Sequence, residues 1–405
     1  MEKEKITISF MFPVTNGVMG GVQMILINLI PYLADNELYK IRLYDYNDGV
    51  VKTKIFGDYP SINIDFIELD GCDLFIPNKG DETFVLFGFQ FIRYGLLFKN
   101  KSGVKILNWD VFYPQWSNID TIKGFKIPGV GKMICNLLSQ NNSQIFMELN
   151  GLKEFSRYDN NISISNIVPV PVPMKKKFTV RKFSKNKPIH IGYIGRAVDW
   201  KIFPLVHFVH DMKRIGVSFK LSVFTNDSLP FEKALDGFYE TNVKYIVGKS
   251  GFELEGLLLD IDLGFSMGTA ALDFARNSIP TILADFGYKK FPLEYKYRWL
   301  FNSDRGNLGN DVFSKFYDPK NGQDLSEIFE QLSSSYEYMA ERCFLYVKKH
   351  HSIESVSSVF LDNIKNTTLT PKLLIKPWFL FKCGMYYIRA KFFPSEVTKN
   401  GLWSN

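Results

Sequence analysis

Ile191-Gly192-Tyr193-Ile194-Gly195-Arg196-Ala197-Val198-Asp199-Trp200-Lys201 is the stretch of this sequence that decides the fold. A short apolar run ends at a glycine, and an arginine and a lysine follow where the next helix is expected to begin. Arg196 can clamp a phosphate with two N–H groups, Lys201 adds a point charge, and a helix N-terminus adds partial positive charge. The pattern predicts a buried strand, a loop and a helix that hold a diphosphate. The alternative is a loop whose two cations are solvated surface charges.

A second stretch rich in small residues lies downstream, from Ser266 to Asp273. Ser266, Gly268 and Thr269 leave backbone N–H groups open at an expected helix start, which predicts a second anion site. Asp273 lies one turn into that helix, where its carboxylate can accept hydrogen bonds from ribose hydroxyls. The alternative is close packing of a helix on a sheet, with Asp273 complementing the helix dipole.

The N-terminal half shows the same succession of elements. The apolar run 6–13 is followed by Gly20 and Gly21 and then by apolar residues at helical spacing in 22–34. Strand-like and helical stretches alternate in both halves, which indicates two parallel α/β domains. Ligands of such domains bind at the carboxyl ends of the strands. We therefore predict two Rossmann-like doubly wound domains that face each other across a cleft.

Proline-rich and basic stretches set the expected boundaries. Alternating valines and prolines in 168–173 cannot lie inside a helix or sheet, and a lysine-rich run follows. The prediction is an acceptor-binding N-terminal domain in 1–170, a linker in 171–187, a donor-binding domain in 188–365, and a tail in 366–405. The tail interleaves lysine and arginine with aromatic residues, which suits an anionic membrane surface. The alternative is a segment that returns to pack on the N-terminal domain.

Composition excludes several classes of protein. With 46% hydrophobic and 22% charged residues, the 405-residue chain is globular rather than disordered. The net charge of +7 suits anionic partners such as nucleotide diphosphates and does not single out nucleic acid. The N-terminus lacks a signal-peptide pattern and no run is long enough to span a membrane, so we expect a cytoplasmic protein, peripheral to the membrane through its tail. No Asp-x-Asp pair lies at the end of an expected strand. Asp260-Ile261-Asp262 has this pattern, but it leads into a strand, so no metal is expected.

The two stretches, in this order, resemble the donor half of GT-B glycosyltransferases of the large retaining class, in particular those of bacterial surface polysaccharide synthesis. Arg196 and Lys201 match the pair that holds the donor diphosphate in that family. Asp273 stands where the family has a glutamate that contacts the ribose, and Gly20-Gly21 resembles its opening loop. The resemblance implies a metal-independent, retaining hexosyltransferase whose co-substrate is a nucleotide-diphosphate sugar and whose acceptor is a saccharide, free or lipid-linked.

Two positions depart from the family pattern. Its first glutamate, which contacts the donor sugar, would fall on Phe265. The family often has a His-Asp pair after a strand of the N-terminal domain, where this sequence has Trp109-Asp110. Asp110 is the candidate catalytic carboxylate, and its alternative role is that of a helix cap. These departures keep two other functions open: a degenerate transferase that serves as a binding or scaffold subunit, and an epimerase-like nucleotide-sugar enzyme.

Overall fold

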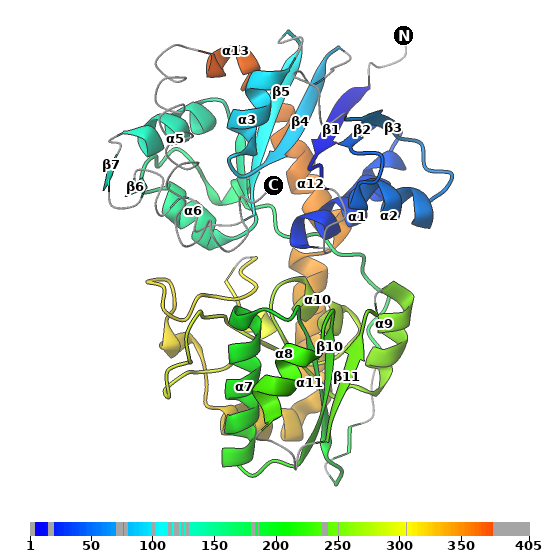
Figure 1. Ribbon diagram of the computed structural model, residues 1–405, viewed down its shortest axis with the longest axis vertical. Helices are drawn as coiled ribbons and strands as arrows, with labels where there is room; N and C mark the ends of the chain where they lie inside the picture. Colours follow the sequence, from blue (N-terminus) through cyan, green and yellow to red (C-terminus); the bar gives the residue numbers. More distant parts are fainter. Residues whose placement is uncertain are drawn as a thin grey trace. The chain divides into compact units, whose positions relative to one another are not determined.

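A computed structural model describes most of the chain: residues 5–14, 20–69, 76, 80–98, 102–111, 116, 121–122, 125–126, 129–179, 183–184, 186–236, 242–249, 251–304 and 306–375. The chain divides into two compact units. In Figure 1, unit 1 runs from blue to green-cyan and includes the orange helices α12 and α13, and most of unit 2 is green to yellow. Unit 1 comprises Met1–Pro171 together with Val356–Asn405, and unit 2 comprises Val172–Ser355. The basic, aromatic residues from 376 onward lie outside the described part of the chain.

Unit 1 is built on a six-stranded parallel sheet with the strand order β3-β2-β1-β4-β5-β8. The strands are β1 (Ile6–Met11), β2 (Tyr39–Asp45), β3 (Asp65–Glu68), β4 (Glu82–Phe87), β5 (Val104–Asp110) and β8 (Gln144–Phe146). The helices are α1 (Gly21–Ala34), α2 (Val50–Asp58), α3 (Gln90–Leu97), α5 (Val130–Gln140), α6 (Leu149–Phe155) and the C-terminal α12 (Ile353–Asn366) and α13 (Pro371–Leu374). A hairpin of β6 (Thr121–Ile122) and β7 (Phe125–Lys126) lies outside the sheet.

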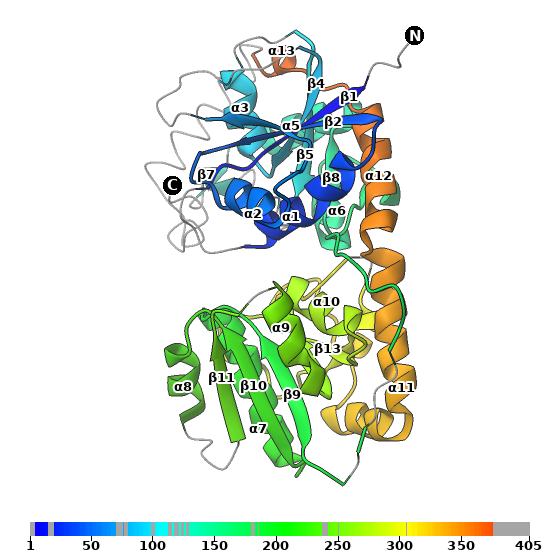
Figure 2. The same cartoon turned by 90° about the vertical axis from the view of Figure 1, so that its right-hand side faces the viewer.

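The C-terminal helices complete unit 1 although they follow all of unit 2 in the sequence. The ring of Phe360 in α12 stacks on Phe10 of β1 and on Trp109 of β5, with centroids 6.0 and 5.5 Å away. The Ile106 N–H donates to the Leu369 carbonyl at 2.8 Å. The first ten residues of the predicted tail, 366–375, therefore belong to unit 1, and Leu369 and Leu374 lie in its hydrophobic core. Figure 2 shows α12 in orange beside the strands of unit 1.

Unit 2 is built on a second six-stranded sheet with the order β11-β10-β9-β12-β13-β14. The strands are β9 (Ile189–Ile194), β10 (Phe219–Thr225), β11 (Asn242–Val247), β12 (Leu263–Ser266), β13 (Thr281–Leu283) and the antiparallel β14 (Arg298–Trp299). The helices are α7 (Asp199–Arg214), α8 (Leu229–Leu235), α9 (Gly251–Leu257), α10 (Thr269–Arg276) and α11 (Leu325–His350), which packs beside α10.

Each face of the unit 2 sheet buries one large aromatic residue from a covering helix. Phe208 of α7 stacks on Phe265 of β12 with centroids 4.1 Å apart. On the other face, Phe274 of α10 lies against Gly192 and Gly264, which are paired in register. A side chain at either glycine would come within 2.7 Å of the Phe274 ring. The two glycines therefore let α10 pack directly on the two central strands.

The predicted fold class is confirmed, because both sheets are doubly wound α/β sheets of the Rossmann type. In unit 1 the chain builds the sheet outward from β1 to β3, and then returns to the middle and continues from β4 to β8 in the other direction. Unit 2 repeats this order with β9 to β11 and β12 to β14. Among the described residues, no helix is long and apolar enough to cross a membrane.

Candidate active site

The switch point of the unit 2 sheet lies between β9 and β12, which start the two halves of the strand order. Ligands of open α/β sheets bind outside the carboxyl ends of the strands at this position. Ser266, the last residue of β12, fixes the two strand ends to each other. Its hydroxyl accepts from the Ile194 N–H at 2.9 Å and donates to the Ile194 carbonyl at 3.2 Å. Ser266 is fully buried, so it builds the edge of the site rather than facing a ligand.

Arg196 and Lys201 extend from the loop and helix that follow β9. Arg196 is exposed and Lys201 is partly exposed, in the first turn of α7. The loop between them is held by Asn226, whose side-chain oxygen accepts from the Ala197 N–H at 3.1 Å. Neither cation forms a hydrogen bond or ion pair with another described side chain. Two cations without a counter-ion at the N-terminus of a 16-residue helix are suited to bind an anion.

Burial and the nearby charge of Arg196 lower the pKa of Lys201 from 10.5 to about 8. The Lys201 ammonium lies 5.2 Å from the centroid of the Trp200 ring, which covers it without a compensating carboxylate. In the absence of a bound anion, the charge on Lys201 therefore costs stability.

We expect Lys201→Met to stabilise the ligand-free protein by about 1–3 kcal/mol at neutral pH, since one pKa unit corresponds to about 1.4 kcal/mol. Below pH 8 both the folded and unfolded states carry the charge, so the cost is fully present. Between about pH 8 and 10.5 the folded state releases the proton and the unfolded state keeps it, so the parent gains stability as pH rises. Thermal melts of both proteins from pH 6 to 10 should converge at the alkaline end, and a pH-independent difference would contradict this.

The turn after β12 brings backbone groups to the same strand ends. Gly268 has φ +64° and ψ −147°, a conformation that strains any residue with a side chain. Its N–H donates to the Leu308 carbonyl at 2.7 Å, so this group is not open to a ligand. Thr269 begins α10, and its partly exposed hydroxyl bonds to no other described residue. In the first turn of α10, the Ala271 N–H donates to the Gly268 carbonyl at 3.1 Å, and the N–H groups of Thr269 and Ala270 point toward the N-terminal end of the helix.

Asp273 is the fifth residue of α10 and is tied to Arg276, one turn further on. The Arg276 Nε donates to the Asp273 Oδ1 at 2.9 Å, and the same guanidinium bonds Glu255 of α9 at 2.9 Å. It also donates to the Pro173 carbonyl of the linker at 3.3 Å. Burial raises the pKa of Asp273, and the charge of Arg276 opposes that rise. One carboxylate oxygen of Asp273 is thereby fixed, and the side chain remains 26% exposed.

Phe265 has a structural role in unit 2. It is fully buried and packs on Phe208, Tyr193 and Tyr297 in the core between the sheet and α7. The family pattern has a glutamate at this position. In this chain the phenylalanine that replaces it lies in the core, so the candidate site has neither a carboxylate nor an aromatic ring from position 265.

The remaining predicted residues lie in unit 1. Gly20 precedes α1, and its N–H donates to the side chain of Gln23 at 3.1 Å. Gly21 is exposed, with nothing within 4 Å of the position of a side chain. Asp110 ends β5, is 2% exposed and accepts from the Trp116 indole N–H at 2.7 Å. This bond fixes Asp110 inside unit 1, where Trp116 is itself fully buried.

The fold of unit 2 thus gathers Arg196, Lys201, Gly268 and Thr269 at the carboxyl ends of β9 and β12, with Asp273 one turn along α10. Gly20, Gly21 and Asp110 are in unit 1, at the ends of β1 and β5. Sequence reasoning missed Arg276 and Glu255, which hold Asp273. The signal for Arg276 was its spacing of three residues from Asp273 on a helix, which brings opposite charges together.

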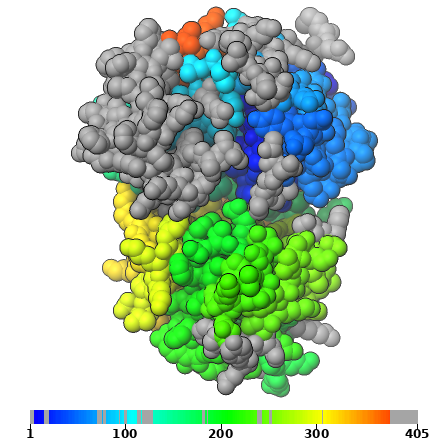
Figure 3. Space-filling view, viewed as in Figure 1, coloured from blue at the N-terminus to red at the C-terminus, as the bar shows by residue number. Residues whose placement is uncertain are grey.

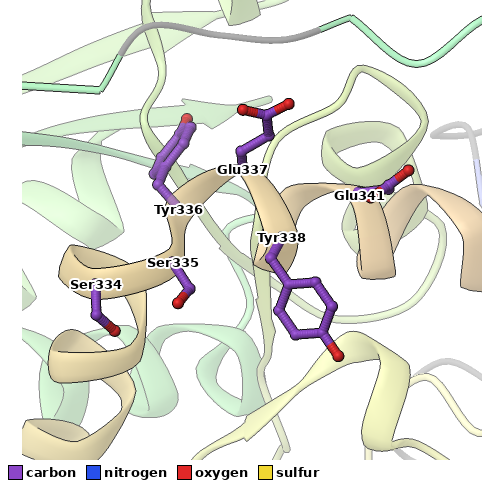
Figure 4. A pocket seen from close by; sticks show the side chains of 6 residues that line it. All are labelled: Ser334, Ser335, Tyr336, Glu337, Tyr338 and Glu341. Carbon is purple, nitrogen blue, oxygen red and sulfur yellow. The ribbon is translucent and has the colours of Figure 1, made fainter.

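Other candidate sites in the described part of the chain are few. No group of three or more His, Cys, Asp or Glu side chains is placed to hold a metal ion there. A shallow cavity of about 420 Å³ lies on α11, where Ser335 interrupts the helix with φ −143° and ψ 43°. Figure 4 shows its lining, which includes Tyr336, Tyr338 and Glu341. It comes from consecutive turns of one helix and carries no unpaired cation.

Comparisons with known proteins support the fold. No protein-family model matches the chain, and no curated protein matches its sequence. Among solved structures, it is similar to a glycosyltransferase from Rickettsia africae ESF-5, at 13% identity and a TM-score of 0.59, covering 89% of this chain and 98% of that one. It is also similar to the apo form of the lipopolysaccharide outer core galactosyltransferase WaaB, at 12% identity and a TM-score of 0.55, covering 89% and 99%. These matches confirm the predicted GT-B fold.

Proposed function

We propose that the protein is a glycosyltransferase of surface polysaccharide synthesis, which transfers a sugar from a nucleotide-diphosphate donor to a saccharide acceptor, free or lipid-linked. The observation that carries this proposal is the pair of unpartnered cations, Arg196 and Lys201, at the switch point of a GT-B donor-type sheet. Their charge and the first turns of α7 and α10 can stabilise the negative charge that develops on a diphosphate leaving group. The proposed reaction therefore needs no divalent ion, and retention of configuration rests on the family resemblance.

In this proposal unit 2 binds the donor and unit 1 the acceptor. Arg196 and Lys201 bind the diphosphate, Thr269 and the N–H groups of α10 bind its second phosphate, and Asp273 accepts from the ribose. Ser266 and Gly268 shape the turn that presents these groups. Asp110 of unit 1 is the candidate catalytic carboxylate, and the Trp116 indole N–H, which donates to its Oδ2, holds it in position.

The direct test is a binding and transfer screen with the full-length protein. Calorimetry with UDP, GDP and inorganic pyrophosphate should give binding of at least one nucleoside diphosphate. Release of nucleoside diphosphate from the matching nucleotide sugars should follow when saccharide acceptors are added. Binding without turnover would favour the scaffold function, which the burial of Phe265 in the core supports.

Asp273→Asn should weaken nucleotide binding and leave pyrophosphate binding unchanged. A hydrogen bond to a charged group contributes about 1.5–3 kcal/mol, so we expect UDP affinity to fall at least tenfold. Glu255→Gln is the matched control, because it removes a carboxylate from the same guanidinium without touching Asp273. Calorimetry with both ligands decides the matter: equal losses for UDP and pyrophosphate would assign Asp273 a structural role.

A further inference from the structure

Two large aromatic side chains are exposed at the carboxyl edge of the unit 2 sheet. Tyr288 is 55% exposed and Phe313 is 51% exposed. They belong to the irregular segments after β13 and before α11, drawn in yellow-green and yellow in Figure 1. The two segments run side by side: the Phe286 N–H donates to the Asn310 carbonyl at 2.8 Å, and the Val312 N–H donates to the Phe286 carbonyl at 2.9 Å.

Close packing fixes these segments to each other. A side chain at Gly287 would lie 3.0 Å from both the Phe313 ring and the Val312 side chain, and 3.3 Å from Phe291. Glycine therefore allows the backbone next to Tyr288 to approach Phe313 directly. The two exposed rings are held by packed backbone and not by a free loop.

A series of rings connects this surface to the proposed diphosphate site. Lys201 lies 5.2 Å from the Trp200 ring, Trp200 contacts Phe286 with centroids 5.7 Å apart, and Phe286 contacts Tyr288 at 6.2 Å. All four residues come from unit 2. The exposed rings are thus a continuation of the site along the same sheet edge.

A carboxylate accompanies the rings. Asp311 forms a parallel bridge with Phe286, two residues before Tyr288, which places it on the segment beside the two rings. Burial raises the pKa of Tyr288, and the charge of Asp311 adds to the rise. Asp311 also accepts from the Phe313 N–H at 3.0 Å. A sugar ring has an apolar C–H face that packs on an aromatic ring and hydroxyls that donate to a carboxylate. Pockets for such ligands combine apolar walls with a few placed polar groups.

We propose that Tyr288, Phe313 and Asp311 form a saccharide-binding surface of unit 2, which takes a sugar ring of the acceptor beside the donor diphosphate. This inference rests on the proposed function and gives unit 2 a part in acceptor recognition. The rival occupant is an anionic bilayer, because Lys289 and Lys290 are exposed and follow Tyr288 directly. Asp311 favours the sugar, because its carboxylate can accept hydrogen bonds from sugar hydroxyls. Figure 3 shows that yellow parts of unit 2, which come from the chain between β13 and α11, reach the surface on this face.

The test compares the double variant Tyr288→Ala/Phe313→Ala with Tyr338→Ala, which removes a tyrosine of similar exposure, 54%, from α11. Saturation-transfer NMR with glucose, galactose, N-acetylglucosamine, maltose and lactose should show at least one sugar binding to the parent and to Tyr338→Ala. Removing both rings should weaken that binding about tenfold, as expected for two aromatic contacts. UDP affinity should be equal in all three proteins.

Three results would overturn the proposal. One is that no sugar of the set binds the parent. Another is that a sugar binds the double variant as well as it binds the parent. The third is that sedimentation with phosphatidylserine vesicles, and no sugar signal, depends on the two rings, which would assign the surface to a membrane. Absence of UDP binding in the parent, with sugar binding intact, would count against the proposed function alone.

Discussion

Replacing both Arg196 and Lys201 with alanine is expected to abolish measurable binding of nucleoside diphosphates and of pyrophosphate. Each charge-assisted contact contributes about 1.5–3 kcal/mol, so each single variant should lose about tenfold to 150-fold in affinity. The loss is expected to be large because neither cation has a counter-ion among the described residues, so no other carboxylate competes with the ligand for them. Calorimetry at moderate salt measures the affinities, since screening weakens contacts to exposed charges.

The control for this pair is Lys220→Ala. Lys220 is also exposed and lies near the amino end of β10, at the opposite edge of the same sheet. It should change affinity by less than twofold if binding depends on the switch point and not on net charge. The fold should survive in all variants, because Arg196 lies in a loop and Lys201 in the first turn of α7. Unchanged affinity in the double variant would show that the diphosphate binds at another place in the protein.

The sequence predicted the central part of unit 2 because short-range patterns specify it. The apolar run before Gly195 could only be a buried strand, and the cations after it had to lie near the start of the next helix. The small residues from Ser266 to Ala271 likewise predicted the turn into α10. Doubly wound connectivity then brings the two strand ends together, which the bond from Ser266 to Ile194 shows.

The partners of the site residues were not predictable in the same way. Asp110 follows a strand as a catalytic carboxylate would, and only the folded chain shows the bond from Trp116 that occupies it. Asp273 has a partner three residues away, yet Glu255 and the Pro173 carbonyl reach the same guanidinium from distant parts of the sequence. Pairing across such separations depends on tertiary packing, which local pattern does not encode.

The segments from 285 to 313 were missed altogether, because they contain little regular structure to predict. They include β14, which is two residues long, and a buried ion pair between Asp285 and Arg298, which no hydrophobic periodicity predicts. Asp285 follows β13 and is 1% exposed, and Arg298 of β14 is 8% exposed. Their side chains are 2.5 Å apart.

Asp285→Ala is expected to destabilise unit 2 by about 3–5 kcal/mol, because it removes the carboxylate that forms an ion pair with a buried guanidinium. The Asp285 carboxylate also accepts from the Asn310 N–H at 2.7 Å and from the Tyr295 hydroxyl at 3.2 Å. Its loss therefore releases the segment that carries Phe313 together with the turn after β13. Hydrogen exchange of the β13 and β14 amides measures the effect in unit 2 alone. A global unfolding experiment would combine the unfolding of both units in one transition.

Two comparisons make this prediction specific to a buried charge. Glu253→Ala breaks the ion pair with Lys249, whose side chains are 66% and 43% exposed, and should cost less than about 1 kcal/mol. The double variant Asp285→Leu/Arg298→Met removes both charges and should be more stable than Asp285→Ala, because neither charged group is then buried in the core. If Asp285→Ala exchanges its β13 amides no faster than Glu253→Ala does, then water or rearranged side chains solvate Arg298, and the pair does not hold the loops of the site in place.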